Sequence, residues 1–348
     1  MRGEVELSVI IPTHGRPAKV AACVAALARQ VGAPALEVLV GCDGPDEAAE
    51  GASREAWHAA GGKPDALRVV HCRKQGQAGV RNELLPLARG RTLVFLNDDM
   101  VPGPGHLAAH ARAQAEAANA PALVIGACPW RVTRPDSLFS RLVRETSMVF
   151  FFDVMEQETD LGRDWGFRHA WLLNLSVPAA LVREVGGFTV FPSTYGYEDD
   201  ELAFRLQKGF GTRVLYRPAA RAEHDHAMTP GEYLSREYKL GYAAAGFART
   251  TPECAGALFG RDVLAAGEIA YCREFTGREL PLARRLHPEF LRLAEAGPEV
   301  IDGPSGAMLR RTLYQWHLPL KRWCWRAGLL EAAEGRAMHP EAALSRLC

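Results

Sequence analysis

Short apolar runs alternate with helix-like segments through the first hundred residues, and this alternation constrains the fold more than any other feature. Each apolar run has the length of a buried strand, and the segments between them carry apolar residues at helical spacing. The predicted strands are Leu7–Ile11, Leu36–Val40, Leu67–His71 and Thr92–Leu96, and the predicted helices are Pro17–Gln30, Asp46–Ala60 and Ala78–Ala88. Such alternation is typical of a parallel sheet, so we predict an α/β protein. Functional loops of such sheets lie beyond the carboxyl ends of the strands.

The chain has 348 residues, more than one compact core usually takes up, so we expect an appended part. Further strands are predicted at Leu123–Gly126, Leu173–Val177 and Arg213–Tyr216, and a further helix at Pro178–Val185. From about Pro230 the pattern is mostly helical. We therefore predict an α/β domain over residues 1–229 and a helical C-terminal region over 230–348. Pro319 is expected to break any single long helix in that region.

Charge, cysteine content and hydropathy bear on partners and location. Lys plus Arg equals Asp plus Glu at 41 each, which argues against a nucleic-acid partner. The eight cysteines are scattered and form no C-x-x-C pair, which favours a reducing, cytoplasmic setting. No apolar run approaches the roughly 20 residues that a transmembrane helix requires. The sequence therefore predicts a soluble protein with no transmembrane segment.

The C-terminal tail mixes basic and aromatic side chains. The sequence leaves two interpretations of this mixture open. The residues concerned are Arg310, Arg311, Leu313, Tyr314, Trp316, Leu318, Lys321, Arg322, Trp323, Trp325 and Arg326. One interpretation is peripheral contact with an anionic membrane surface, at the inner face of the membrane. The other is a helical arm that packs on the α/β domain, with its Arg and Trp side chains at the rim.

Two adjacent carboxylates, Asp98 and Asp99, follow Asn97 at the end of the predicted strand Thr92–Leu96. Adjacent acids at the mouth of a buried strand repel one another and resist loss of water, unless a cation or hydrogen-bond donors compensate. A divalent ion such as Mg²⁺ or Mn²⁺ that also binds a diphosphate is one explanation. A solvated turn in which Asp caps a helix is the other.

A second acidic cluster, Glu198 to Glu201, begins a predicted helix, and the pair His224 and His226 follows the strand Arg213–Tyr216. Acids in the first turn of a helix are stabilised by its dipole, or one of them can serve as a general base. The His-x-His spacing places both imidazoles on one face of an extended chain, as metal ligands require, although histidines in a loop are also common as polar surface.

A glycine-containing segment, Gly76 to Asn82, lies between the third predicted strand and the next helix. Backbone N–H groups and an arginine at such a helix start suit an anionic or nucleotide ligand. The segment contains neither the G-x-G-x-x-G fingerprint nor a P-loop, so it does not identify the ligand.

Taken in order, these segments resemble family-two glycosyltransferases of the GT-A fold, from about Leu7 to Arg249. The segments that carry the resemblance are Ser8–Thr13, Gly41–Gly44, Ala78–Asn82, Phe95–Asp99, Asn174–Val177, Val185–Phe188, Tyr197–Asp200 and His224. The resemblance implies a Rossmann-like, mostly parallel sheet flanked by helices. It also implies a nucleotide-binding half over residues 1–100 and an acceptor-binding and catalytic half over residues 101–229.

The resemblance also implies roles for individual residues. The donor-binding residues are Pro12, Thr13, His14, Arg16, Asp43, Gly76, Arg81, Asn97 and Asp98. Among them Asp43 would accept from a base N–H, which favours a UDP-sugar. Asp99 and His224 would ligate Mn²⁺ or Mg²⁺, with His226 as an alternative to His224. Asp199, or else Glu198, would deprotonate the acceptor hydroxyl.

The implied reaction is inverting transfer of a sugar from a nucleotide-diphosphate sugar to a hydroxyl group. The acceptor would be a glycan, a lipid-linked molecule or a small molecule, in the synthesis of cell-surface glycans or glycoconjugates. Two departures from the family pattern bear on the donor contacts: the opening reads Pro12-Thr13-His14-Gly15-Arg16, and Asn97 stands where many relatives have Asp. A metal-dependent carbohydrate hydrolase or deacetylase, and a non-catalytic relative that only binds sugar nucleotides, are the alternatives.

Overall fold

The computed structural model describes residues 5–132, 135–193 and 195–348. The chain forms two compact units. The first, here called the α/β unit, comprises Met1–Arg131, Val154–Val190 and Glu198–His226. The second, here called the helical unit, comprises Val132–Asp153, Phe191–Tyr197 and Ala227–Cys348. The predicted division between residues 229 and 230 stays a prediction.

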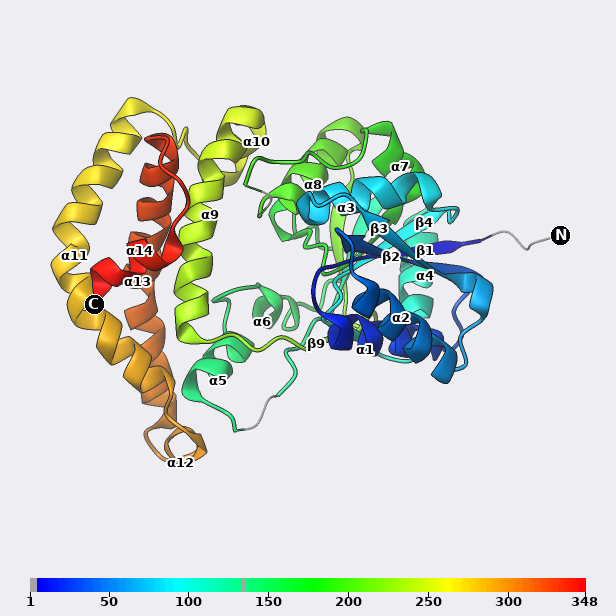
Figure 1. Ribbon diagram of the computed structural model, residues 1–348, viewed down its shortest axis with the longest axis horizontal. Coiled ribbons are helices and arrows are strands. Elements are labelled where there is room, and N and C mark those ends of the chain that lie inside the picture. The colour runs from blue at the N-terminus through cyan, green and yellow to red at the C-terminus, as the bar shows by residue number, and fades with distance from the viewer. Residues whose placement is uncertain (1–4, 133–134, 194) are drawn as a thin grey trace. The chain divides into compact units, whose positions relative to one another are not determined.

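The α/β unit is built on a seven-stranded, mostly parallel sheet (Figure 1). Its strands are β1 (Leu7–Thr13), β2 (Leu36–Asp43), β3 (Leu67–Cys72), β4 (Thr92–Leu96), β6 (Ala122–Gly126), β7 (Asn174–Pro178) and β8 (Arg213–Arg217). Their order across the sheet is β3-β2-β1-β4-β7-β6-β8, and β7 runs antiparallel to both its neighbours. All seven strands lie where the sequence predicts them, and the α/β fold class is confirmed.

The helices of this unit follow the predicted alternation. They are α1 (Pro17–Ala28), α2 (Glu47–Ala59), α3 (Gly76–Leu84), α4 (His106–Glu116), α7 (Ala179–Glu184) and α8 (Glu198–Phe210), with 3₁₀ turns at Pro64–Ala66, Leu85–Leu87 and Phe167–His169. Helix α1 begins with Pro17, whose fixed φ suits a first turn, and its buried stripe is Val20, Cys23, Val24 and Leu27. Helices α1 and α2 lie side by side in Figure 1.

A short two-stranded ribbon positions the residues of interest. Strand β5 (Met100–Pro102) starts one residue after Asp99 and pairs antiparallel with β9 (Ala222–His224). In this register Met100 lies opposite His224, and the Asp225 N–H donates to the Asp99 carbonyl over 2.7 Å. The ribbon therefore brings the turn after β4 next to the histidine pair.

The helical unit consists of helices and short turns. They include α5 (Leu138–Glu145), α9 (Pro230–Thr250), α10 (Pro252–Phe259), α11 (Ala266–Ala294), α12 (Pro298–Ile301), α13 (Gly306–Ala333), α14 (Pro340–Leu344) and a 3₁₀ turn at Ser345–Leu347, while the short helix α6 (Phe152–Met155) lies where the chain passes between the units. Helices α9, α11 and α13 pack side by side (Figure 1). Helix α9 crosses α13 at glycines, because a Cβ added at Gly241 would lie 1.8 Å from the Trp325 carbonyl oxygen.

The expectation that Pro319 breaks a long helix is wrong. Helix α13 runs without interruption from Gly306 to Ala333 and contains Pro319. A proline inside a helix removes one hydrogen bond and crowds the preceding turn, at a cost of about 3 kcal/mol. The residues around it, Leu313, Leu320 and Trp323, are fully buried, and burial of large apolar side chains contributes about 1.5–3 kcal/mol each. Packing within the helical unit therefore offsets the local cost.

Among the described residues, no helix combines the length and the apolar character needed to cross a membrane.

Candidate active site

Asp98 and Asp99 lie in the turn between β4 and β5, and both are buried. Thr13, at the end of β1, donates its hydroxyl to Asp98 Oδ2 over 2.7 Å. Arg16 Nε donates to the same oxygen over 3.1 Å, its Nη2 donates to Asp98 Oδ1, and its Nη1 donates to Asp99 Oδ2 over 3.1 Å. One guanidinium therefore bridges both carboxylates, which resolves the repulsion that their adjacency creates.

The pKa values of the two carboxylates are shifted in opposite directions. Burial raises the pKa of Asp98 to about 6, against the opposing effect of Arg16. Burial also acts to raise the pKa of Asp99, but His224, His226 and Arg16 outweigh it and hold that pKa well below its usual range. Asp99 is therefore ionised at neutral pH.

Asp99, His224 and His226 form a cluster with the chemistry of a metal site. His224 Nε2 lies 3.7 Å from Asp99 Oδ1, and His226 Nδ1 lies 3.4 Å from Asp99 Oδ2. One ligand atom from each residue lies within 4.8 Å of the others. Asp99 Oδ1 is buried and accepts no hydrogen bond from the described residues. A buried, ionised carboxylate that has one oxygen without a donor and lies beside two imidazoles fits a divalent cation.

Neighbouring side chains hold the histidine segment in place. Lys19, on α1, donates to the Asp225 carbonyl over 2.7 Å and lies 2.9 Å from its Oδ2. Arg131 lies 3.4 Å from the same carboxylate oxygen. The Trp130 ring lies 4.3 Å from the His224 ring, and the His224 ring stacks on that of His226 at 5.4 Å. Sequence reasoning missed Lys19 and Trp130, since both reach this cluster only through the fold.

Asp43 and Gly76 meet at the start of α3. Asp43 Oδ1 accepts from the Gln75 N–H over 2.7 Å and from the Gly76 N–H over 3.1 Å, and Gly76 has a φ of +77° that favours glycine. His14 lies beside them, with its Nε2 3.4 Å from Lys74 Nζ. Pro12 is buried in β1, one residue before Thr13. Asp43 therefore already caps a helix, which fixes its carboxylate at the edge of the sheet.

Arg81 connects the acidic cluster at α8 with the turn after β4. It is 1% exposed, and its Nη2 donates to Asn97 Oδ1 over 3.3 Å and to Gln77 Oε1 over 3.0 Å. Its Nη1 lies 3.5 Å from Glu198 Oε1, and its guanidinium lies over the Phe188 ring at 5.6 Å. A buried arginine with these partners serves as the counter-charge of the cluster.

Asp199 lies in the first turn of α8, where loss of hydration and the neighbouring Glu198 raise its pKa to about 6, against the effect of Arg81. Tyr197, just before this helix, has a φ of +71°, a strained conformation for a residue other than glycine. Among the described residues no hydrogen bond or ion pair joins Asp199, Asp43 or His14 directly to Asp99. The Arg81 and Asn97 pair is the link between the two acidic clusters.

The sequence model of the family described as "Glycosyl transferase family 2" matches residues 8–164. Residues 8–164 therefore belong to glycosyl transferase family 2. The matched residues of this glycosyltransferase include Thr13, Arg16, Asp43, Arg81 and the two carboxylates after β4. The histidine pair and α8 lie beyond the match.

Two curated relatives are similar to part of this chain. The validoxylamine A glucosyltransferase of Streptomyces hygroscopicus subsp. limoneus is 32% identical over 250 residues, which are 64% of this chain and 52% of the relative. The pre-mycofactocin glycosyltransferase of Mycobacterium tuberculosis (strain CDC 1551 / Oshkosh) is 27% identical over 194 residues, 53% of this chain and 37% of the relative. This glycosyltransferase thus spans about half or less of each relative's length. The mannosyltransferase PcManGT from Pyrobaculum calidifontis, in complex with GDP-Man and Mn²⁺, has a TM-score of 0.49 at 18% identity, over 99% of this chain and 79% of that chain.

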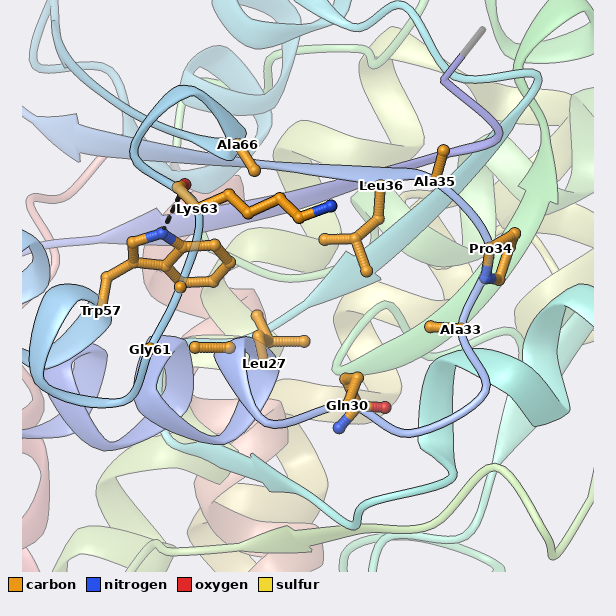
Figure 2. A pocket seen from close by; sticks show the side chains of 12 residues that line it. Leu27, Gln30, Ala33, Pro34, Ala35, Leu36, Trp57, Gly61, Lys63 and Ala66 are labelled. Carbon is orange, nitrogen blue, oxygen red and sulfur yellow. Dashed lines mark hydrogen bonds between the residues drawn. The ribbon is translucent and has the colours of Figure 1, made fainter. Parts of the chain in front are cut away.

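A separate hollow of about 240 Å³ lies at the opposite edge of the sheet, where β2 begins (Figure 2). Leu27 and Leu36 line it together with the Trp57 ring, whose Nε1 donates to the Lys63 carbonyl over 2.9 Å. Gln30 also lines it, but its amide already binds Gly103 and the start of α4. This hollow of the glycosyltransferase therefore offers few unpaired polar groups and lies away from the strand ends that carry the acidic clusters.

Proposed function

We propose that this family 2 glycosyltransferase moves a sugar from a nucleotide-diphosphate sugar, with UDP-sugars favoured, to a hydroxyl acceptor with inversion of configuration. The observation that carries the proposal is the buried Asp99 beside His224 and His226 at the carboxyl edge of the sheet. An ionised carboxylate oxygen without a donor at this edge indicates a cation, and a cation here indicates a diphosphate.

The donor is proposed to bind along the strand ends. Thr13, Asp43 and Arg81 are assigned to the nucleoside, with Pro12, His14 and Gly76 beside them. The Asp43 carboxylate, oriented by two backbone N–H groups, keeps lone pairs for a base N–H, which supports the preference for uracil. Asn97 and Asp98 are assigned to the ribose or donor sugar, and Arg16 lies where it can reach a diphosphate.

The cation is proposed to be Mn²⁺ or Mg²⁺, held by Asp99 and His224, with His226 as a third ligand. Mg²⁺ is bound almost entirely by oxygen atoms, so two imidazoles favour Mn²⁺. When bound, such an ion supplies positive charge that offsets the charge on the departing diphosphate. Lys19 and Arg131, through Asp225, hold the two imidazoles in place for this task.

Asp199 is proposed as the general base, with Glu198 as the alternative. A carboxylate whose pKa is raised to about 6 is still ionised at neutral pH and is a stronger base than an exposed Asp. It accepts the acceptor's hydroxyl proton while the oxygen attacks the anomeric carbon and the diphosphate leaves. One displacement inverts the configuration, so no covalent glycosyl-enzyme is required.

The acceptor and the cellular setting are also proposals. The relatives are named for validoxylamine A and pre-mycofactocin, which supports a small-molecule acceptor ahead of a glycan or a lipid-linked molecule. A glucosyl donor is favoured by the first name. Seven of the eight cysteines are buried, which supports the predicted reducing, cytoplasmic location. Peripheral membrane contact through the helical region remains a prediction.

The direct test is a panel of UDP-, GDP- and dTDP-sugars incubated with the protein and Mn²⁺. Donor hydrolysis or transfer is expected with at least one donor, and EDTA and Asp99→Asn should each abolish it. Turnover that EDTA leaves unchanged would contradict the proposal. Calorimetry with free UDP separates the alternatives: a carbohydrate hydrolase or deacetylase would not bind it, whereas a non-catalytic relative would bind it without any turnover.

A further inference from the structure

Without a donor, the Arg16 side chain binds the two carboxylates that follow β4. Its guanidinium lies within hydrogen-bonding distance of Asp98 Oδ1, Asp98 Oδ2 and Asp99 Oδ2. Asp99 Oδ2 is also the oxygen nearest to His226, at 3.4 Å. The arginine therefore shares an oxygen with one of the candidate metal ligands.

The charges around Asp99 Oδ2 indicate that Arg16 and a bound divalent ion would compete for this oxygen. A divalent ion held by Asp99 and the two histidines would lie a few ångströms from the Arg16 guanidinium, since both contact the same carboxylate. Like charges at that separation repel strongly in a partly buried setting. Arg16 is 38% exposed, whereas Asp98 and Asp99 are 0% and 5% exposed. The arginine is thus exposed enough to turn away from the two carboxylates.

We propose that Arg16 is a resident counter-ion that occupies the acidic pair until a metal-bound diphosphate arrives, and then turns to the diphosphate. This inference rests on the proposed function. In the protein without donor, Arg16 offsets part of the negative charge of Asp98 and Asp99 and gives each buried carboxylate a partner. Its planar fork suits the phosphate oxygens as well as it suits carboxylates, so it exchanges one bidentate partner for another.

Replacing Arg16 should therefore have opposite effects on the binding of Mn²⁺ and on the binding of a nucleoside diphosphate. Removing the guanidinium leaves the carboxylate pair with a more negative potential and no competitor. Mn²⁺ alone should then bind on the order of tenfold more tightly, from Coulomb repulsion at an intermediate dielectric. Nucleoside diphosphate should bind more weakly to the Mn²⁺-loaded protein, because its partner is missing. The ratio of Mn²⁺ affinities with and without UDP should therefore shrink, as reciprocal coupling requires.

The experiment is a titration of Mn²⁺ into the parent protein, Arg16→Gln and Arg16→Lys, with and without UDP. Free Mn²⁺ is measured by electron paramagnetic resonance, and quenching of Trp130 fluorescence gives a second readout, because that ring lies 4.3 Å from His224. Arg54→Gln is the matched control, since it removes one exposed arginine that pairs with Glu50 on α2. Circular dichroism checks that each variant is folded.

The expected result is tighter Mn²⁺ binding by Arg16→Gln alone, near-parental binding by Arg16→Lys, which keeps the charge, and no change in Arg54→Gln. Equal or weaker Mn²⁺ binding by Arg16→Gln would overturn the counter-ion role and leave the metal site intact. Equal tightening in Arg54→Gln would also overturn it, because net charge would then explain the effect. Absence of Mn²⁺ binding in every protein, with or without UDP, would overturn both this inference and the proposed metal site.

Discussion

Lowering the pH from 7 to 5 is expected to destabilise the α/β unit, because helix α4 carries two buried histidines. His106 and His110 lie one turn apart and each places its Nε2 against Asn174 Oδ1, at 2.7 and 2.9 Å. The Asn174 amide nitrogen donates to the Ala220 carbonyl over 2.8 Å, so the oxygen must face the histidines. His110 Nδ1 lies 2.9 Å from the Ser176 hydroxyl. This network suits two neutral rings.

The magnitude follows from the shifted pKa values. Burial lowers the pKa of His106 to about 3 and that of His110 to about 4, and the rings lie 4.7 Å apart, so a second charge is opposed further. The unfolded chain takes up a proton on each ring below a pH of about 6.5, whereas the folded protein does not. Stability therefore falls as the pH drops below that value. Between pH 7 and 5 the loss is about 2 kcal/mol for each histidine, or about 4 kcal/mol for the pair.

The assay is an NMR titration of the imidazole resonances, combined with urea unfolding at several pH values. Neither His106 nor His110 should titrate in the folded protein between pH 8 and 5. The pH dependence of unfolding should be shallower in His110→Gln than in the parent, since that variant loses one proton-binding group from the unfolded chain. A normal titration of either ring with a midpoint near 6.5 would refute the reasoning.

Further predictions concern the base, the helical unit and the histidine segment. The kcat/KM of transfer should fall as the pH drops through about 6, because Asp199 must be ionised to act, and Asp199→Asn should retain donor binding but lose about 10²–10⁴ in rate. A Cβ at Gly328 would lie 2.1 Å from the Tyr238 carbonyl oxygen, so Gly328→Ala should destabilise the protein by about 1–3 kcal/mol in urea unfolding. Gly277→Ala, in open space within α11, should instead stabilise it by about 0.5–1 kcal/mol, and a similar loss in both would contradict the packing argument. Asp225→Ala should weaken Mn²⁺ binding in calorimetry, and unchanged affinity would show that the two cations at that carboxylate do not position the histidines.

The sequence predicted the α/β fold well because its signals are local. The stripe of Val20, Cys23, Val24 and Leu27 on α1 depends only on helical spacing, and all four residues are buried as predicted. The place of Asp99 at the carboxyl edge of the sheet followed from the buried strand before it. Pro319 shows where local reasoning fails, because packing of the surrounding apolar side chains decides whether the helix continues.

The sequence could suggest the residues of the candidate site but not the contacts between them. Nothing near Arg16 in the sequence indicates that it binds carboxylates more than 80 positions away, since this contact depends on the parallel register of β1 and β4. His226 joins the cluster because β9 pairs with β5, two strands of three residues that are too short to give a periodic signal. The partners of the Asp225 carboxylate come from α1 and from the chain after β6, and only the fold brings them together.

The most direct measurement of the central claim is a crystal structure of the protein soaked with Mn²⁺ and UDP, with anomalous diffraction recorded to locate manganese. The account predicts an anomalous peak within coordination distance of Asp99 Oδ1 and the His224 imidazole, bridged to the diphosphate of UDP. Bound UDP with manganese elsewhere, or with no manganese beside Asp99, would contradict it.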